Sequence, residues 1–291
     1  MPAAEIAVDE ALVRALLQAQ HPDLARWPLR RLANGWDNVL FRLGDELVVR
    51  LPRRELAVPL VAHEQRWLPE LAPRLPLPVP VPVRVGRPGA GYPWPWSVCA
   101  WMPGESALVA PPTDPGATAD TLGRFLAALH VPAPADAPHN PFRGIPLADR
   151  QVRTLDALER LGDAVDGPRL RALWHELAAT PVWSGPPVWV HGDTHPGNLV
   201  VHEGRLSAVV DFGDLCSGDP ASDLAVAWML LPHEHHDAFR AAAGAGGDDD
   251  LWTRARAWAL ALGLVLRADS ADNPPYLALG TRTLAAVLTD G

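Results

Sequence analysis

The spacing of apolar and polar positions changes along the chain. In the first hundred residues, apolar residues recur at helical spacing over 8–20 and 58–71. Short apolar runs bounded by turn residues predict strands at 29–33, 39–43, 47–51 and 96–101. The run 75–85 alternates proline with apolar residues, which predicts an extended linker. This part of the chain is therefore expected to form a small β-rich lobe.

From residue 117 onward the pattern is mainly helical, with short apolar runs between the helices. Helices are predicted at 117–130, 147–161, 169–179, 221–231, 233–243, 249–268 and 276–288. Strands are predicted at 188–190, 199–201 and 206–210. The pattern indicates a larger helical lobe, joined to the first lobe by a connector near residues 100–106 and carrying short strands beside its polar loops.

Composition narrows the class of protein. Apolar residues make up 48% of the chain, as in an ordinary globular protein with a core. The net charge of −9 argues against a nucleic-acid partner. The two cysteines, Cys99 and Cys216, have neither metal-ligand nor disulfide-framework spacing. We see no secretory signal and no apolar run that could span a membrane, so we expect a cytoplasmic protein without a membrane partner.

The residues with the clearest chemistry lie in two loops, each tied to a short strand. The first is His191-Gly-Asp-Thr-His-Pro-Gly-Asn198, and the second begins at Asp211-Phe-Gly-Asp. Phosphoryl transfer needs a carboxylate that accepts a hydrogen bond from the attacking hydroxyl, which suits Asp193. Magnesium prefers a few hard oxygen ligands, and Asn198 with Asp211 supplies them. We expect His191 to brace the loop by hydrogen bonding.

Other interpretations of these loops remain open. Asp, Asn, Gly and Pro are common in plain turns. A metal-dependent phosphoesterase could use the same polar residues together with His195, although its further histidines, such as His202, lack a strand context. A nucleotide-binding protein that has lost catalysis is a third possibility, against which the intact polar set argues.

Three motifs in order resemble the aminoglycoside phosphotransferase family of small-molecule kinases. They are His191-Gly-Asp193-x-His195-x-x-Asn198, then Asp211-Phe-Gly, then Gly218-Asp-Pro-x-x-Asp223-Leu-Ala. The resemblance implies an α+β, protein-kinase-like fold with a nucleotide-binding lobe (1–100) and a helical lobe (101–291). It implies that Asp193 is the catalytic carboxylate and that Asn198 and Asp211 hold Mg²⁺. Asp223 is then expected to brace the catalytic loop; helix capping is a second interpretation, and both roles can hold at once.

The first lobe supplies an independent test of this resemblance. Glu64 falls on the apolar stripe of the 58–71 helix, where an unpaired carboxylate is costly. Arg50, on the 47–51 strand, is its best partner. Kinases place a lysine on this strand to hold nucleotide phosphates, but all 25 basic residues here are arginine. We predict that Arg50 replaces that lysine. A surface salt bridge is the alternative, and Arg53 and Arg54 are expected to face solvent.

Two further nucleotide contacts are predicted in the first lobe. The segment 34–38 lies where a family member's glycine-rich loop would cover the nucleotide, but it holds a single glycine, so only Asn38 is carried forward as a contact. The segment around Cys99 and Trp101 resembles the family's hinge, where adenine bonds to backbone groups. Backbone recognition leaves little trace in a sequence, so this prediction depends on position alone.

The resemblance implies an ATP-dependent O-phosphotransferase, with GTP as a possible donor, acting on a small-molecule hydroxyl. We expect an aminoglycoside or another antibiotic as acceptor, with a macrolide or a small metabolite (sugar, amino alcohol) as alternatives, and a monomer or homodimer. Acidic residues that could receive a polycation are Glu234, Asp237, Asp249, Asp250 and Asp290. The tryptophans 228, 252 and 258 are expected to pack in the core. The His233–His236 cluster resembles a metal site only superficially.

Overall fold

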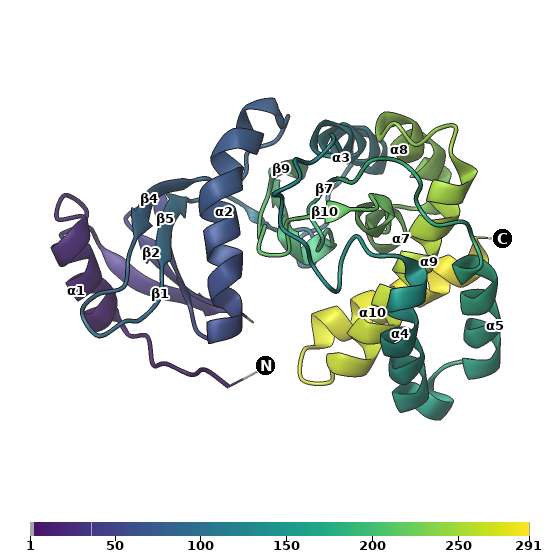
Figure 1. The fold of residues 1–291 in the computed structure, drawn as a ribbon, viewed down its shortest axis with the longest axis horizontal. Coiled ribbons are helices and arrows are strands. Elements are labelled where there is room, and N and C mark those ends of the chain that lie inside the picture. The colour runs from purple at the N-terminus through teal and green to yellow at the C-terminus, as the bar shows by residue number, and fades with distance from the viewer. Residues whose placement is uncertain (1–2, 36, 291) are drawn as a thin grey trace. The chain divides into compact units, whose positions relative to one another are not determined.

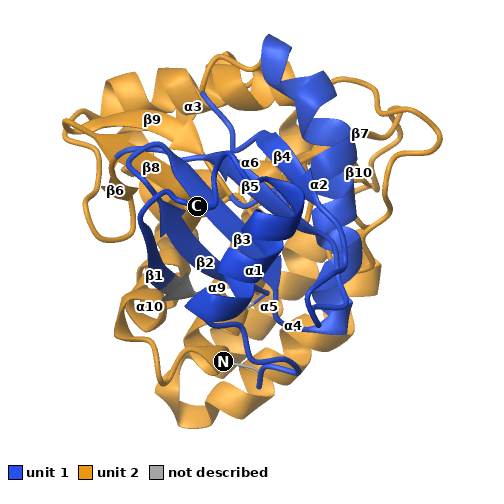
Figure 2. Ribbon diagram, turned by 90° about the vertical axis from the view of Figure 1, so that its left-hand side faces the viewer, with its two compact units in different colours: residues 1–74, 78–103, 211–213 blue, residues 75–77, 104–210, 214–291 orange. Residues whose placement is uncertain are grey.

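The computed structural model describes residues 3–35 and 37–290, and the chain divides into two compact units (Figures 1 and 2). Unit 1 comprises residues 1–74, 78–103 and 211–213, and unit 2 comprises residues 75–77, 104–210 and 214–291. The three-residue segment Asp211–Gly213 of the second motif therefore belongs with unit 1. Its sequence neighbours Val210 and Asp214 belong with unit 2.

Unit 1 is built on a five-stranded antiparallel sheet with the order β1-β2-β3-β5-β4. The strands are β1 (Leu29–Asn34), β2 (Asn38–Leu43), β3 (Leu47–Pro52), β4 (Pro82–Gly86) and β5 (Trp96–Ala100). Its helices are α1 (Glu10–Gln20) and α2 (Val58–Leu71), with short 3-10 turns η1 (Glu55–Ala57) and η2 (Ala72–Arg74). The two predicted helices and the four predicted strands of this part are thus confirmed to within a few residues.

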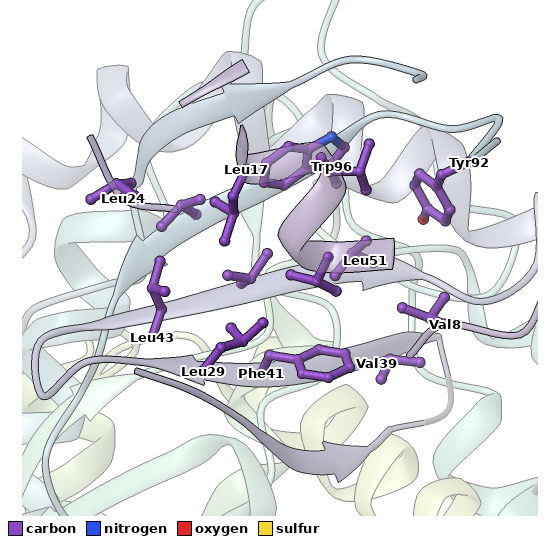
Figure 3. Packing of buried hydrophobic residues seen from close by; sticks show 14 residues of the cluster. Val8, Leu17, Leu24, Leu29, Val39, Phe41, Leu43, Leu51, Tyr92 and Trp96 are labelled. Atoms are coloured by element: carbon purple, nitrogen blue, oxygen red, sulfur yellow. The ribbon is translucent and has the colours of Figure 1, made fainter. Parts of the chain in front are cut away.

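Each face of this sheet meets one helix, because successive side chains of a strand point to opposite faces. Val49 and Leu51 of β3 join the apolar core beneath α1, as do alternate residues of β2 and β5 (Figure 3). Arg50 lies between them in sequence and therefore points to the other face. There α2 contacts the sheet, and Gln65 donates hydrogen bonds to Ser97 Oγ and the Trp96 carbonyl of β5. Strand alternation thus directs Arg50 toward α2.

The proline-rich run corrects one prediction. Residues 75–85 were expected to form a linker only, but β4 begins at Pro82 and pairs with β5 along one edge of the sheet. Proline lacks the N–H that a central strand would need, so it is tolerated where only one side of the strand is paired. The alternation of proline with apolar residues is therefore compatible with an edge strand as well as with a linker.

Unit 2 is mainly helical. Its helices are α3 (Pro115–Leu129), α4 (Leu147–Leu161), α5 (Gly167–Ala178), α6 (Ala221–Leu224), α7 (Val226–Leu230), α8 (His236–Ala242), α9 (Asp249–Asp269) and α10 (Pro274–Thr289), with 3-10 turns η3 (Gly162–Ala164), η4 (Pro196–Asn198) and η5 (His233–His235). Its strands are β6 (Glu105–Ser106), β7 (Val188–Val190), β8 (Leu199–His202), β9 (Arg205–Val209) and β10 (Cys216–Gly218). Trp258 on α9 and Trp228 on α7 are buried, as predicted, whereas Trp252 is half-buried against Trp228.

The short strands of unit 2 fix the ends of its polar loops. β7 ends at Val190, directly before His191, and pairs with β10. β8 begins directly after Asn198 and pairs with β6 and β9. The predicted helix 221–231 is divided at Ala225 into α6 and α7, and the predicted helix 233–243 begins with the η5 turn. Within the described part of the chain, no helix is both long and apolar enough to cross a membrane.

Candidate active site

The loop from His191 to Asn198 in unit 2, called here the catalytic loop, is held by the fully buried carboxylate of Asp223. Its Oδ1 accepts hydrogen bonds from Gly192 N at 2.9 Å and Thr194 Oγ1 at 3.0 Å. Its Oδ2 accepts from His191 N at 2.8 Å and lies 3.0 Å from His130 Nε2. Burial alone would raise the pKa of Asp223, but His130 and these donors hold it below its usual range.

These contacts agree with the bracing role expected of Asp223, whereas a different residue caps the helix. Asp223 lies inside α6 rather than before it. Asp219 is the residue at the start of the helix that accepts a hydrogen bond from Ala221 N, at 3.0 Å. The carboxylate of Asp223 is thereby left for the catalytic loop.

His191 and His195 brace the same loop through both of their ring nitrogens. His191 Nε2 lies 3.1 Å from the Val210 carbonyl, and its Nδ1 accepts from Asp193 N at 3.2 Å. His195 Nδ1 accepts from Gly197 N at 2.9 Å, and its Nε2 lies 3.3 Å from Asp193 Oδ2. These contacts agree with the bracing expected of His191. They also leave neither imidazole a lone pair for a metal, which argues against the phosphoesterase interpretation.

Gly192 allows the turn that presents the next residue. Its φ is +84°, in the region that favours glycine, and a Cβ there would lie 2.5 Å from the Asp214 carbonyl oxygen. The backbone of the catalytic loop and that of Asp214 consequently lie in close contact, although they are 22 positions apart by residue number.

Asp193 carries the central carboxylate of the loop. Its Oδ1 accepts from Arg143 Nη2 at 3.0 Å, and its Oδ2 accepts from Asn198 Nδ2 at 3.1 Å. Burial opposes ionisation, but His195 and Arg143 hold the pKa of Asp193 far below its usual range. The carboxylate therefore stays ionised at neutral pH and in one orientation.

Asn198 turns its amide nitrogen toward Asp193, because Nδ2 also donates to the Asp193 carbonyl at 2.9 Å. The two acceptors assign the amide orientation and leave Oδ1 as an oxygen donor for a cation. Asn198 lies in the η4 turn, and its own carbonyl accepts from Val210 N at 2.9 Å. Strand ends on both sides thus position an oxygen ligand of the kind that Mg²⁺ prefers.

Arg143 and Asp214 belong to this cluster but were not singled out from the sequence. Arg143 Nη2 lies 3.4 Å from Asp214 Oδ2, and Asn140 Nδ2 donates to Asp214 Oδ1 at 2.8 Å. Burial alone would lower the pKa of Arg143, but the two aspartates raise it, so the guanidinium stays charged. Arg143 lies in the loop between α3 and α4, and no motif marks it. Asp214 could have been found, since it follows the Asp-Phe-Gly triplet directly.

Unit 1 contains a second charged cluster. Arg50 Nη1 donates to Glu64 Oε1 at 2.9 Å, and both side chains are more than nine-tenths buried, so the predicted pair is internal rather than a surface salt bridge. Arg50 Nη2 lies 3.4 Å from Asp211 Oδ1, and Glu64 Oε1 also accepts from Phe212 N at 3.1 Å. Burial opposes its charge, but Glu64 and Asp211 raise the pKa of Arg50, which stays cationic.

Asp211 has two properties that suit a ligand-binding carboxylate. Its side chain is 56% exposed, so the charge is accessible. Its φ is +63°, a left-handed conformation that is uncommon outside glycine and asparagine or aspartate. Backbone held in such a conformation is often found at functional sites.

The remaining predicted contacts of unit 1 are placed as follows. Cys99 is buried in β5, and the N–H of Trp101 donates to the Glu46 carbonyl at 2.7 Å, so that N–H is not available to a base. Asn38 begins β2, whereas Trp36 lies outside the described residues. The expectation that Arg53 faces solvent is wrong: it is buried and donates to the Gly35 carbonyl at 3.1 Å.

Comparison with known proteins gives one family. Residues 28–258 match the family described as "Phosphotransferase enzyme family". Comparison with curated proteins by sequence gave no match.

Several solved structures have a similar fold. The GDP and kanamycin complex of APH(2")-IIia is 16% identical, with 96% of this chain and 99% of that chain covered and a TM-score of 0.72. Macrolide 2'-phosphotransferase MphH from Brachybacterium faecium, as the apoenzyme, is 23% identical over 96% and 98% of the two chains, with a TM-score of 0.59. The streptomycin-ATP-APH(2")-IIa ternary complex is 17% identical over 97% and 99%, with a TM-score of 0.58.

The fold and the family agree. An antiparallel sheet with a buried Arg–Glu pair and a helical unit with a braced aspartate loop both fall within the matched residues 28–258, which are well over half of the chain. The protein therefore belongs to the phosphotransferase enzyme family, as an enzyme with the α+β, protein-kinase-like fold.

Proposed function

We propose that this enzyme transfers the γ-phosphoryl group of a nucleoside triphosphate to a hydroxyl of a small molecule of the antibiotic class, with Asp193 as the catalytic carboxylate. The observation that carries the proposal is the fixed orientation of Asp193. Its two oxygens are held by Arg143 on one side and by Asn198 and His195 on the other. Phosphoryl transfer depends mainly on positioning and charge, and this arrangement provides both.

The low pKa of Asp193 defines its role. A carboxylate that is ionised over the whole physiological range accepts a hydrogen bond from the acceptor hydroxyl and orients it for attack. Because its proton affinity is weak, it does not withdraw the hydroxyl proton before the transfer is under way. Arg143 supplies a fixed positive charge beside this hydroxyl, where negative charge of the phosphoryl group arrives.

We propose Asn198 and Asp211 as ligands of Mg²⁺, which neutralises phosphate charge when it is bound with the nucleotide. The donor set fits this ion, since Asn198 offers an amide oxygen and Asp211 an exposed carboxylate. Imidazole and thiolate, which favour transition metals, are absent from the proposed pair.

Arg50 is proposed as the phosphate anchor in place of the usual lysine. Glu64 holds Nη1, so the planar guanidinium keeps one orientation and can present its other N–H groups to phosphate oxygens. We propose base contacts near Cys99 and Trp101, which must use groups other than the Trp101 N–H, and a further nucleotide contact at Asn38. ATP is the proposed donor and GTP its alternative, since solved relatives bind ATP, ADP or GDP.

An aminoglycoside is the acceptor expected from the sequence, but one observation favours a macrolide as a second candidate. A cavity of about 320 Å³ in unit 2 is lined by apolar residues and by charged residues of both signs, namely Phe142, Ile145 and Val152 with Arg150, Arg153, Asp149 and Asp156. Phe142, which is part of this lining, directly precedes Arg143 in the sequence. The two arginines and two aspartates balance in charge, so this partly apolar lining has no acidic excess to attract a polycation and suits an acceptor of low charge.

The test is an ADP-release screen with ATP and Mg²⁺ across aminoglycosides, macrolides and small metabolites. One class should give turnover that Asp193→Ala abolishes, while ATP binding measured by calorimetry changes less than about twofold. His202→Ala, at an exposed position, is the matched control and should keep full turnover. Absence of both ATP binding and turnover would refute the proposal. Equal loss of binding and turnover in Asp193→Ala would show that Asp193 is structural.

A further inference from the structure

Three possible metal ligands meet in unit 2 at residues to which the proposed reaction assigns no role. They are His233 in η5, His236 at the start of α8, and Asp290, which follows α10. One ligand atom from each lies within 4.8 Å of the others. Helix α10 packs against α7 in this unit (Figure 1), so tertiary structure brings the carboxylate to histidines more than fifty positions away.

His233 and Asp290 already form a contact. His233 Nδ1 lies 2.8 Å from Asp290 Oδ1, and the His233 side chain is 74% exposed. The rings of His233 and His236 have their centroids 5.3 Å apart, with their planes inclined by 63°. The histidine is thus reachable from solvent and close to the second imidazole.

His236 has a feature that the protein alone does not explain. The residue is buried, and its Nε2 lies 3.3 Å from the Leu231 carbonyl. Its Nδ1 is buried and has no hydrogen-bond partner among the described residues. The Leu231 carbonyl can only accept a hydrogen bond, so Nε2 carries the hydrogen and the neutral ring has a lone pair on Nδ1. Buried polar atoms without a partner are rare and call for an explanation such as an ion.

The groups behind the ligands resemble those of metal sites. A ligating histidine usually donates its second ring N–H to a carbonyl, as His236 does to Leu231. A ligating carboxylate is usually oriented by a further hydrogen bond, and Asp290 Oδ2 accepts from Trp228 Nε1 at 2.7 Å. Both oxygens of Asp290 therefore have partners within the protein.

We propose that His233, His236 and Asp290 form a binding site for a divalent transition metal, Zn²⁺ in the first place. Two imidazole nitrogens and one carboxylate oxygen are ligands that Zn²⁺ accepts, with a water in the fourth position. The set is unsuited to Mg²⁺ or Ca²⁺, which require mainly oxygen ligands. A bound ion joins the end of α10 to the η5–α8 turn, with His236 as one of its three ligands.

The experiment uses the full chain, stripped of metal with a chelator and kept free of nucleotide. Zn²⁺ is titrated in, with binding followed by calorimetry and metal content measured after desalting. We expect one Zn²⁺ per chain. An ion that binds only the folded state should raise Tm by roughly 5 °C at a hundredfold excess over Kd. Mg²⁺ at the same concentration should produce neither effect.

Variants distinguish the site from incidental binding to surface histidines. His233→Ala changes an exposed side chain and Asp290→Asn is isosteric, so both should fold, and each should weaken Zn²⁺ binding at least tenfold. His202→Ala and His235→Ala are the matched controls and should leave binding unchanged. Equal binding in all four variants, or no binding by the parent protein at about 10 μM Zn²⁺, would overturn the proposal. Neither outcome depends on phosphotransfer, so the metal-site proposal can fail while the proposed function stands.

Discussion

Replacing Asp223 with asparagine tests whether this carboxylate organises the catalytic loop. The substitution keeps the shape of the side chain but exchanges one oxygen for an NH₂ group. In the parent protein the two oxygens serve four donor groups, two on each oxygen. In Asp223→Asn, one pair of donors still meets the side-chain oxygen. The other pair meets the NH₂ group, which is itself a donor and cannot accept their hydrogen bonds. The side chain has no exposed surface, so water cannot replace the lost acceptor.

The magnitude follows from the two lost bonds. Hydrogen bonds to a charged group contribute about 1.5–3 kcal/mol each, so Asp223→Asn should lower the free energy of unfolding by about 3–6 kcal/mol. That is a large part of the roughly 5–15 kcal/mol expected for a folded protein. Urea denaturation followed by fluorescence measures it. Asp120→Asn, in an exposed pair on α3, is the control and should cost at most about 1 kcal/mol.

The pH dependence provides a second test of the same carboxylate. The pKa of Asp223 is lowered in the folded state, so the unfolded chain, with a pKa of about 3.9, binds the proton more readily. Its stabilising contribution is thus complete above about pH 5 and is lost as pH falls through 4 toward the folded pKa. The stability difference between parent and Asp223→Asn should shrink over that range. A difference below about 1 kcal/mol at pH 7, or one that does not change with pH, would refute this account.

Three further predictions concern the charged clusters and one helix contact. In steady-state ADP release, Arg50→Ala should raise KM for ATP at least about tenfold more than Arg53→Ala does, because loss of a charged phosphate contact costs about 1.5–3 kcal/mol of binding free energy. Similar effects of the two variants would contradict the assignment of Arg50 as the phosphate anchor. Arg143→Ala should lower kcat/KM in steady-state ADP release, because it removes the cation that holds the Asp193 carboxylate in one orientation, and Arg143→Lys should restore part of the loss; an unchanged kcat/KM in Arg143→Ala would contradict this role. Gly123→Ala places a Cβ 2.6–2.8 Å from atoms of α8 and should lower the free energy of unfolding, measured by urea denaturation, by about 1–3 kcal/mol. Gly116→Ala on the same helix, with no neighbour closer than 3.5 Å, is the control and should be neutral or stabilise the protein by up to about 1 kcal/mol. Equal values for the two variants would show that the contact between the helices relaxes.

The candidate site was predictable where one short segment contains both the reacting group and its strand. Asn198 and Asp211 adjoin predicted strands and Asp193 lies three positions after the end of one, and those strands formed where the apolar runs placed them. Glu64 was predictable for a different reason, since its position on an apolar stripe required a buried partner. Arg143 was not predictable, because its contact with Asp193 joins a loop without periodicity to a residue 50 positions away.

The sequence by itself determined the helices and strands, the loops that carry the polar residues, and the inward position of Glu64, because all of these depend on local spacing. Tertiary structure alone decided which distant groups meet. It made β4 an edge strand, gave Asp223 four donors, placed Arg143 on Asp193, and brought Asp290 to the histidines of η5 and α8. The physical reason is that a hydrogen bond or ion pair across the fold depends on how the elements pack, which local spacing does not encode.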